Sequence, residues 1–213
     1  MTMNNSYRIV RVRAVEGGAR LLVELEWQEC GECCHETLSL LSGRMTRLPE
    51  IGPVTPETVE DLRHKSQVCA AIGAGLRALG ATGSSRRHLT QKLCARGFAY
   101  EIAKEAVEEL AEKGYLKEEE GALREAEKNL AKLWGDRRIL ADLRAKGYAA
   151  GALKYAAARL RAENGTDRCA LLIRKRRMAF PTDDASLRKF MAALARYGYS
   201  QAEIKAAMKI RKN

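Results

Sequence analysis

Hydrophobic and polar residues alternate near the start of the chain, in two segments separated by a short turn. In RLLVELEW, a period of two places on one face Leu21, Val23, Leu25 and Trp27, which is typical of a half-buried strand. Residues 7–15 alternate less strictly, because Val10 and Val12 interrupt the pattern. Between the segments, Glu16-Gly17-Gly18-Ala19 predicts the turn of a β-hairpin. Residues 35–41 are a candidate third strand.

The pattern changes to a helical period after a proline-rich segment, which we interpret as a linker holding Pro49, Pro53 and Pro56. Thr55 followed by Pro56 predicts the start of a helix, because Thr is a favoured N-cap and Pro suits the first helical position. The apolar residues that follow are spaced for one buried stripe, made of Val59, Leu62, Cys69, Ile72, Leu76 and Leu79. The glycines of residues 80–83 are expected to end this helix.

A related stretch then occurs three times, about fifty residues apart, as KLCARGF (92–98), DLRAKGY (142–148) and ALARYGY (193–199). Each copy has a leucine four positions before a glycine and an aromatic residue directly after it. Glycine adopts the left-handed conformation that commonly ends a helix, and a hydrophobic contact between the leucine and the aromatic accompanies such a cap. We therefore predict structural turns between two helices at Gly97-Phe98, Gly147-Tyr148 and Gly198-Tyr199.

The segments around these turns predict tandem three-helix repeats. Ser200 and Glu203 form a capping-box pattern for the helix after the last turn, whereas Ala99 and Ala149 are weaker helix starts. A third helix is expected at about 117–133 and again at about 167–179, but not after the last copy. Three short helices cannot bury their apolar faces alone, so stacked copies are expected to form an elongated, curved array.

The predicted fold is therefore mainly α, with a small N-terminal β region. We expect a β region and linker over residues 1–55 and a connecting helix over 56–83. The helical repeats are expected over 84–134, 135–180 and 181–213, of which the last is truncated.

Positive charge is concentrated in the last eighty residues. Residues 134–213 hold 19 Lys and Arg against 7 Asp and Glu, a net charge of +12, whereas the whole chain has a net charge of +11. Such asymmetry indicates a polyanionic partner, with nucleic acid first, although a solvated basic face is the simpler alternative. The densest basic run is Arg174-Lys175-Arg176-Arg177, for which we expect a helix with residues 174 and 177 on one face.

The order and spacing of the repeated motifs resemble the RecX family of bacterial recombination regulators. The matching text is SSRRHLTQKLCARGF (84–98), EELAEKGYL (108–116), GDRRILADLRAKGY (135–148) and ALARYGYSQAEI (193–204). The resemblance covers about residues 59–210. It departs from the family after GYL, where Gly121 stands in place of an aromatic residue, and in the absence of a final helix.

The resemblance implies a protein that binds the RecA recombinase filament on single-stranded DNA, along its groove. Such a protein hinders strand exchange and damps the ATPase and coprotease activities, with no catalytic residue and no cofactor. The basic side chains at the edges of the repeats are the candidate contacts with RecA or DNA: Arg87, Arg96, Arg137, Arg138, Lys146, Arg174, Lys175, Arg176, Arg177, Arg188, Lys189 and Arg196. Few aromatics lie among them, which favours phosphate or acidic protein surface over base stacking.

The alternative function is direct DNA binding, as in a transcription factor, because helix-turn-helix units also join helices through a Gly turn. Against it, the helices after these turns are rich in alanine rather than in base-reading polar residues. No nucleotide-binding loop, membrane helix or signal peptide is recognisable in the sequence. We expect a cytoplasmic monomer that is not an enzyme.

A third reading rests on Cys30, Cys33, Cys34 and His35, in the stretch CGECCH. A C-x-x-C pair with a nearby His is half of a zinc site, and the missing ligand could be Cys34, His64 or Cys69. Redox chemistry is a further option, and free thiols in a reduced compartment are the simplest. Because no clear fourth ligand follows from the sequence, we expect no bound metal here. Cys69, Cys94 and Cys169 are expected to be small core residues.

Overall fold

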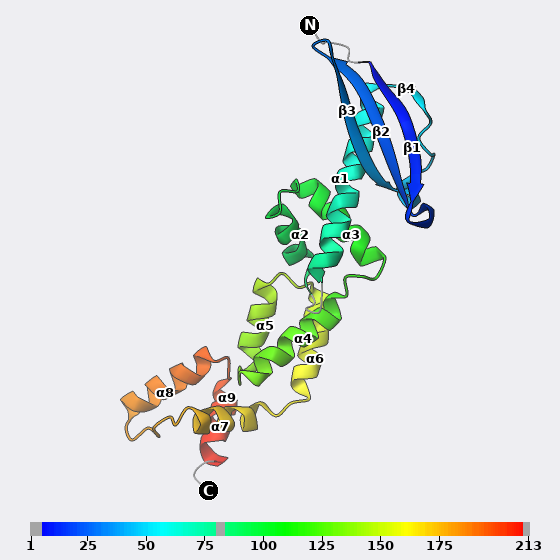
Figure 1. Ribbon diagram of the computed structural model, residues 1–213. Coiled ribbons are helices and arrows are strands. Elements are labelled where there is room, and N and C mark those ends of the chain that lie inside the picture. The colour runs from blue at the N-terminus through cyan, green and yellow to red at the C-terminus, as the bar shows by residue number, and fades with distance from the viewer. Residues whose placement is uncertain (1–5, 80–83, 211–213) are drawn as a thin grey trace. The chain divides into compact units, whose positions relative to one another are not determined.

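The computed structural model describes residues 6–79 and 84–210. The chain begins with an antiparallel sheet whose strand order is β3-β2-β1-β4 (Figure 1). The strands are β1 (Tyr7–Val15), β2 (Arg20–Glu29), β3 (Glu32–Leu41) and β4 (Gly52–Val54), and short 3-10 turns lie at Glu16–Gly18 and Ser42–Arg44. The expected hairpin and the candidate third strand are thus both present.

Two details of the sheet differ from the expectation. A β-bulge between Ile9 and Arg11 shifts the register, so that Ile9 and Val12 both pack on the core despite their odd spacing. The proline-rich segment is not only a linker, because β4 lies within it and pairs with the start of β1. Pro53 fits there because β4 is an edge strand, where a missing N–H breaks no ladder.

The remainder of the described chain is helical, which confirms the mainly α fold with a small N-terminal sheet. The helices are α1 (Pro56–Leu79), α2 (Arg86–Cys94), α3 (Tyr100–Glu112), α4 (Glu118–Ala131), α5 (Asp136–Ala145), α6 (Ala150–Arg161), α7 (Gly165–Lys175), α8 (Asp184–Arg196) and α9 (Gln201–Ile210). Thr55 caps α1, since its hydroxyl accepts a bond from the N–H of Thr58 at 3.3 Å. The expected break at residues 80–83 lies outside the described residues.

The chain divides into two compact units. The first comprises residues 1–78 and 90–113, and the second comprises residues 79–89 and 114–213. The boundaries that we drew along the sequence follow the repeat period instead, and as domain boundaries they stay a prediction.

In the first unit, α1 covers one face of the sheet. The shared core consists of Ile9, Leu21, Val23, Leu25, Leu38, Leu40, Val59 and Leu62. At the other end of α1, a methyl group on Gly75 would lie 2.6 Å from Leu110 of α3. Within the same helix, Val68 and Ala71 are fully buried, whereas Leu76 is 42% exposed. The prediction that Leu76 belongs to the buried stripe was therefore wrong.

The second unit contains two hydrophobic clusters of three helices each. α4, α5 and α6 share one core, and α7, α8 and α9 share the other. α4 meets α6 through small side chains, with Ala122 and Ala126 on α4 and Ala152 and Ala156 on α6 all buried. This close approach explains why the helices after the glycine turns are rich in alanine. Packing thus groups each expected third helix with the two helices that follow it.

Candidate protein and nucleic-acid interface

The three Gly-aromatic turns have the geometry that the sequence predicts. Gly97, Gly147 and Gly198 have positive φ values of 95°, 77° and 97°. In each turn the aromatic N–H donates to the leucine carbonyl, over 3.3 Å from Phe98 to Leu93, 3.2 Å from Tyr148 to Leu143, and 3.3 Å from Tyr199 to Leu194. These bonds define a Schellman cap. The predicted capping box is also confirmed, because the N–H of Ser200 donates to Glu203 at 2.7 Å and the N–H of Glu203 donates back at 3.2 Å.

Within the second unit, two of these turns form hydrogen bonds with the start of another helix. Ser85, at the N-terminus of α2, donates its hydroxyl to the carbonyl of Lys146 at 2.5 Å. At the start of α5, the N–H of Gly135 donates to the carbonyl of Tyr197 at 2.7 Å. Lys146 and Tyr197 each directly precede a turn glycine. The turns therefore end one helix and hold the start of another.

Four of the predicted contact cations are held at a glycine turn, a carbonyl, carboxylates or the ring of Trp134. Arg87 packs its aliphatic stem against Gly147, and Arg96 donates to the carbonyl of Ala74 at 2.9 Å. Lys146 binds Glu125 at 2.6 Å and Asp142 at 2.9 Å. Arg138 lies with its guanidinium carbon 3.8 Å from the ring centre of Trp134. These side chains have structural roles, and contacts of theirs with RecA or DNA stay a prediction.

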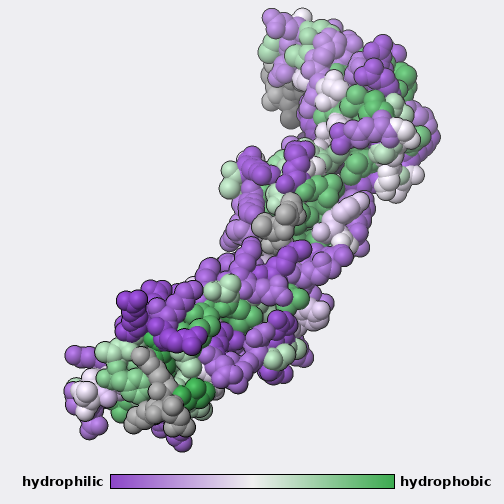
Figure 2. All heavy atoms as spheres, turned by 60° about the horizontal axis from the view of Figure 1, so that its bottom comes forward, coloured by the Kyte–Doolittle hydropathy of each residue, from purple (hydrophilic) through white to green (hydrophobic). Residues whose placement is uncertain are grey.

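The other predicted cations are exposed, and within residues 6–79 and 84–210 no ion pair holds any of them. They are Arg137, Arg174, Lys175, Arg176, Arg177, Arg188, Lys189 and Arg196. All belong to the second unit, and all except Arg137 lie on or beside α7 and α8. Hydrophilic side chains dominate the face seen in Figure 2, with apolar ones in smaller areas between them.

One expectation for the basic run was wrong. α7 ends at Lys175, so Arg174 and Arg177 do not share a helix face. Arg177 instead has a φ of 48°, and the N–H of Met178 donates to the carbonyl of Ile173 at 3.1 Å. Arg177 therefore occupies the position that glycine holds in the other turns. A positive φ is unusual for a residue with a side chain, and the sequence carries no signal for it.

One aromatic ring lies among the basic residues and contacts arginines from other parts of the chain. Tyr197 ends α8 with the guanidinium of Arg138 at 5.7 Å and that of Arg176 at 5.9 Å from its ring centre. These distances suit cation–π attraction. Arg138 of α5 and Arg176, which directly follows α7, thus meet at the ring of Tyr197, which directly follows α8.

A buried ion pair was also missed by the sequence analysis. Arg168 of α7 is only 8% exposed and forms a hydrogen-bonded ion pair with Asp136 at the start of α5. Burial raises the pKa of Asp136, although the charge of Arg168 opposes that shift. Nearby, Tyr199 donates its hydroxyl to the carbonyl of Leu133 at 2.8 Å. These contacts join the two three-helix clusters of the second unit.

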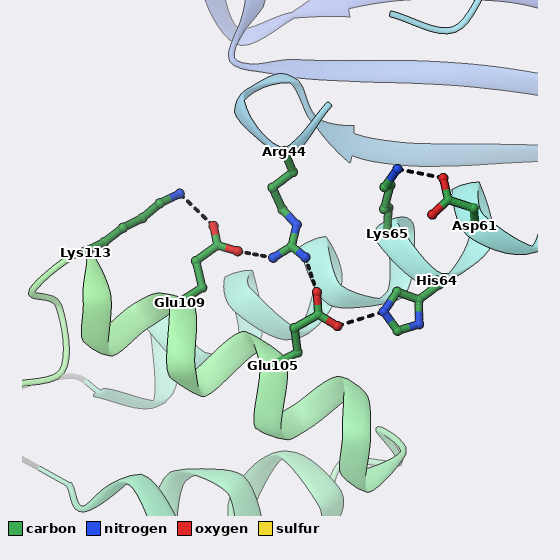
Figure 3. A network of polar contacts seen from close by, with 7 residues as sticks. All are labelled: Arg44, Asp61, His64, Lys65, Glu105, Glu109 and Lys113. Carbon is green, nitrogen blue, oxygen red and sulfur yellow. Dashed lines mark hydrogen bonds and ion pairs between the residues drawn. The ribbon is translucent and has the colours of Figure 1, made fainter. Parts of the chain in front are cut away.

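In the first unit, a polar network connects the turn after β3 to α3 (Figure 3). Arg44 forms ion pairs with Glu105 and Glu109, and the Nε2 atom of His64 lies 2.7 Å from Glu105. Burial by itself would raise the pKa of Glu105, but hydrogen bonds from His64 and Arg44 outweigh it and lower that pKa. His64 is thus engaged with Glu105 rather than with the cysteines.

The cysteine and histidine side chains of CGECCH separate on the two faces of the hairpin. Glu26 of β2 and Cys33 and His35 of β3 place one potential ligand atom each within 4.8 Å of one another. Cys30 is in the turn, with a φ of 52°. Cys69 and Cys169 are buried as expected, whereas Cys94 is partly exposed. Burial raises the pKa of the Cys169 thiol to about 12.

Among the described helices, none is long and apolar enough to span a membrane.

Comparison with known proteins places the chain among regulators. No family model matches the sequence. A curated relative, the regulatory protein RecX of Mycobacterium leprae (strain Br4923), is 31% identical over 155 residues, which span 70% of this chain and 86% of the relative.

Two solved structures share the fold. The crystal structure of a regulatory protein RecX aligns with a TM-score of 0.69 at 15% identity, over 95% of this chain and 99% of that one. RecX from Lactobacillus salivarius aligns with a TM-score of 0.57 at 16% identity, over 67% of this chain and 95% of that one.

Together, the sheet, the glycine turns and the successive three-helix clusters define a mainly helical protein built from repeats. The chain belongs to the RecX family.

Proposed function

We propose that this chain regulates the RecA recombinase by binding along the RecA filament on single-stranded DNA. It damps strand exchange, ATPase and coprotease activity without catalysing a reaction, and acts as a cytoplasmic monomer. Membership of the RecX family is the observation that carries this proposal.

The distribution of cations supports the same proposal. On and beside α7 and α8 gather exposed basic side chains that form no ion pair with the described residues, and they are available to phosphates or to acidic protein surface. Arginine suits both partners, because its planar guanidinium binds carboxylate and phosphate through two parallel hydrogen bonds. By contrast, Lys146 and Arg168 are already neutralised by carboxylates of this chain.

The experiment that tests the proposal is a RecA ATPase assay on single-stranded DNA, with increasing amounts of this chain. We expect turnover to fall, and the inhibition to weaken as salt rises, because counterion release and screening govern such contacts. Wild-type protein that leaves RecA turnover unchanged in large excess would contradict the proposal. Tight binding to single-stranded DNA without RecA, measured by fluorescence anisotropy, would then favour direct DNA binding.

A charge-reversal variant sharpens the assay. Arg176 stacks on Tyr197 and Arg177 forms a helix cap, so we leave both unchanged and reverse cations that form no ion pair with the described residues. The variant carries Arg174→Glu, Lys175→Glu, Arg188→Glu and Lys189→Glu, and it should inhibit about tenfold more weakly or worse, as for loss of several phosphate contacts.

The matched control reverses four exposed cations of the first unit, none of them in an ion pair of the described chain: Arg8→Glu, Arg13→Glu, Arg77→Glu and Lys104→Glu. Both variants lose the same charge, so an equal effect would attribute the inhibition to net charge rather than to α7 and α8. Unchanged helix content by circular dichroism verifies that each variant folds.

A further inference from the structure

The outer face of the N-terminal hairpin carries three side chains of a kind that bind metal ions. In the register of β2 and β3, Leu25 pairs with Glu36, Glu26 with His35, Trp27 with Cys34, and Gln28 with Cys33. Leu25 belongs to the core, and side chains alternate between the two faces of a strand. Glu26, Cys33 and His35 therefore share the face directed away from the core, whereas Cys34 lies on the core side.

The spacing of the ligand atoms matches a tetrahedral zinc ion. The Cys33 Sγ atom lies 3.2 Å from the Glu26 Oε1 atom and 3.6 Å from the His35 Nε2 atom. Bond lengths of about 2.3 Å for Zn–S and about 2.0–2.1 Å for Zn–N and Zn–O imply about 3.5–3.6 Å from sulfur to a nitrogen or oxygen ligand of a tetrahedral site, and about 3.3–3.4 Å from nitrogen to oxygen. The two distances from Cys33 are thus close to those that one zinc ion requires, and all three ligand atoms lie within 4.8 Å of one another.

The chemistry of the three ligands also suits zinc. Thiolate, imidazole and carboxylate are its usual protein ligands, and three protein ligands leave the fourth position to water or to a group from outside the chain. On binding, the Cys33 thiol would release its proton and form the S–Zn bond. The thiolate and carboxylate charges would then balance the charge of the ion.

The geometry points to a surface zinc site formed by Glu26, Cys33 and His35, with one open coordination position. From the sequence we expected no metal here, because none of Cys34, His64 and Cys69 was a clear further ligand. The structure instead supplies Glu26, which lies nine residues before His35 in the sequence and directly opposite it in the sheet. This inference does not depend on the proposed regulation of RecA.

The test uses the full chain, freed of metal under a phosphine reductant that does not bind zinc. Zinc is added at micromolar concentration, and the bound metal is measured by equilibrium dialysis and elemental analysis. We expect one ion per chain, and an affinity at least about tenfold lower in each of Cys33→Ser, His35→Ala and Glu26→Gln, as for other changes around metal sites. Cobalt(II) as a probe should show thiolate charge-transfer absorption that Cys33→Ser abolishes.

Cys34→Ser is the matched control, because the two cysteines are neighbours in sequence but lie on opposite faces of the sheet. It should keep full affinity and the cobalt spectrum. Absence of stoichiometric binding would overturn the inference, as would an equal loss in Cys34→Ser or unchanged affinity in Glu26→Gln. Because Cys33 and His35 are exposed, circular dichroism of the variants should match that of the wild type.

Discussion

Two glycines with nearly the same backbone conformation meet different surroundings. Gly114 has a φ of 76° with no atom of the described chain within 4 Å of an added methyl group, whereas Gly147 has a φ of 77° with the Arg87 Cδ atom at 2.6 Å. Both lie in the second unit. The pair therefore separates the cost of left-handed backbone from the cost of a crowded contact.

We predict that Gly114→Ala destabilises the protein by about 1 kcal/mol, the usual cost of a left-handed alanine. Gly147→Ala should cost about 1–3 kcal/mol more, because the methyl group must displace Arg87, which docks on this turn. Chemical denaturation of both variants measures the difference. Equal midpoints would mean that Arg87 does not press against Gly147 in solution.

The helices and their turns show how far the sequence leads at the level of elements. The Gly-aromatic turns could be predicted because glycine, leucine and the aromatic residue each have a fixed place in the cap. Similar caps at Leu133, with a φ of 59°, and at Arg177 could not be predicted, since packing overrides the ordinary preference of these residues. The register of β2 and β3, which places Glu26 opposite His35, could likewise be determined only from the structure.

The candidate interface was predicted only in part. The sequence located the excess of cations, but it could not separate exposed side chains from those that Glu125, Asp136 or a turn already holds. That distinction depends on which residues distant in the chain become neighbours. Arg168, which lies within the basic segment, is for this reason a buried structural residue.

The contact between the turn after β3 and α3 should depend on pH. The pKa of Glu105 is lowered in the folded protein, so its stabilising effect is present above the ordinary value of about 4.3. It is lost as the pH falls through the lower folded value. We predict that Glu105→Gln lowers the melting temperature near neutral pH and that the difference from wild type shrinks below about pH 4. Thermal melts across this range test it, and a difference independent of pH would exclude the carboxylate charge as its cause.

For the whole molecule, the repeat period of about fifty residues in the sequence predicts an elongated particle, which stays a prediction. A compact chain of 213 residues would have a radius of gyration of about 17 Å. We expect small-angle X-ray scattering of the monomer to give a clearly larger value and an asymmetric distance distribution. A value near that of a sphere would mean that the repeats fold back on one another.

In the second unit, the start of one helix contacts the glycine turn of the next bundle along the chain. The bundles therefore follow one another in a fixed order and use the same kind of contact each time. A further bundle inserted into the series would bring both a helix start and a turn, so each separated helix start would find an equivalent turn. α8 begins with a capping box, in which the Asp183 side chain accepts a hydrogen bond from the N–H of Ser186. Gene duplication could therefore change the number of bundles easily, with a self-capped helix such as α8 marking where a series can stop.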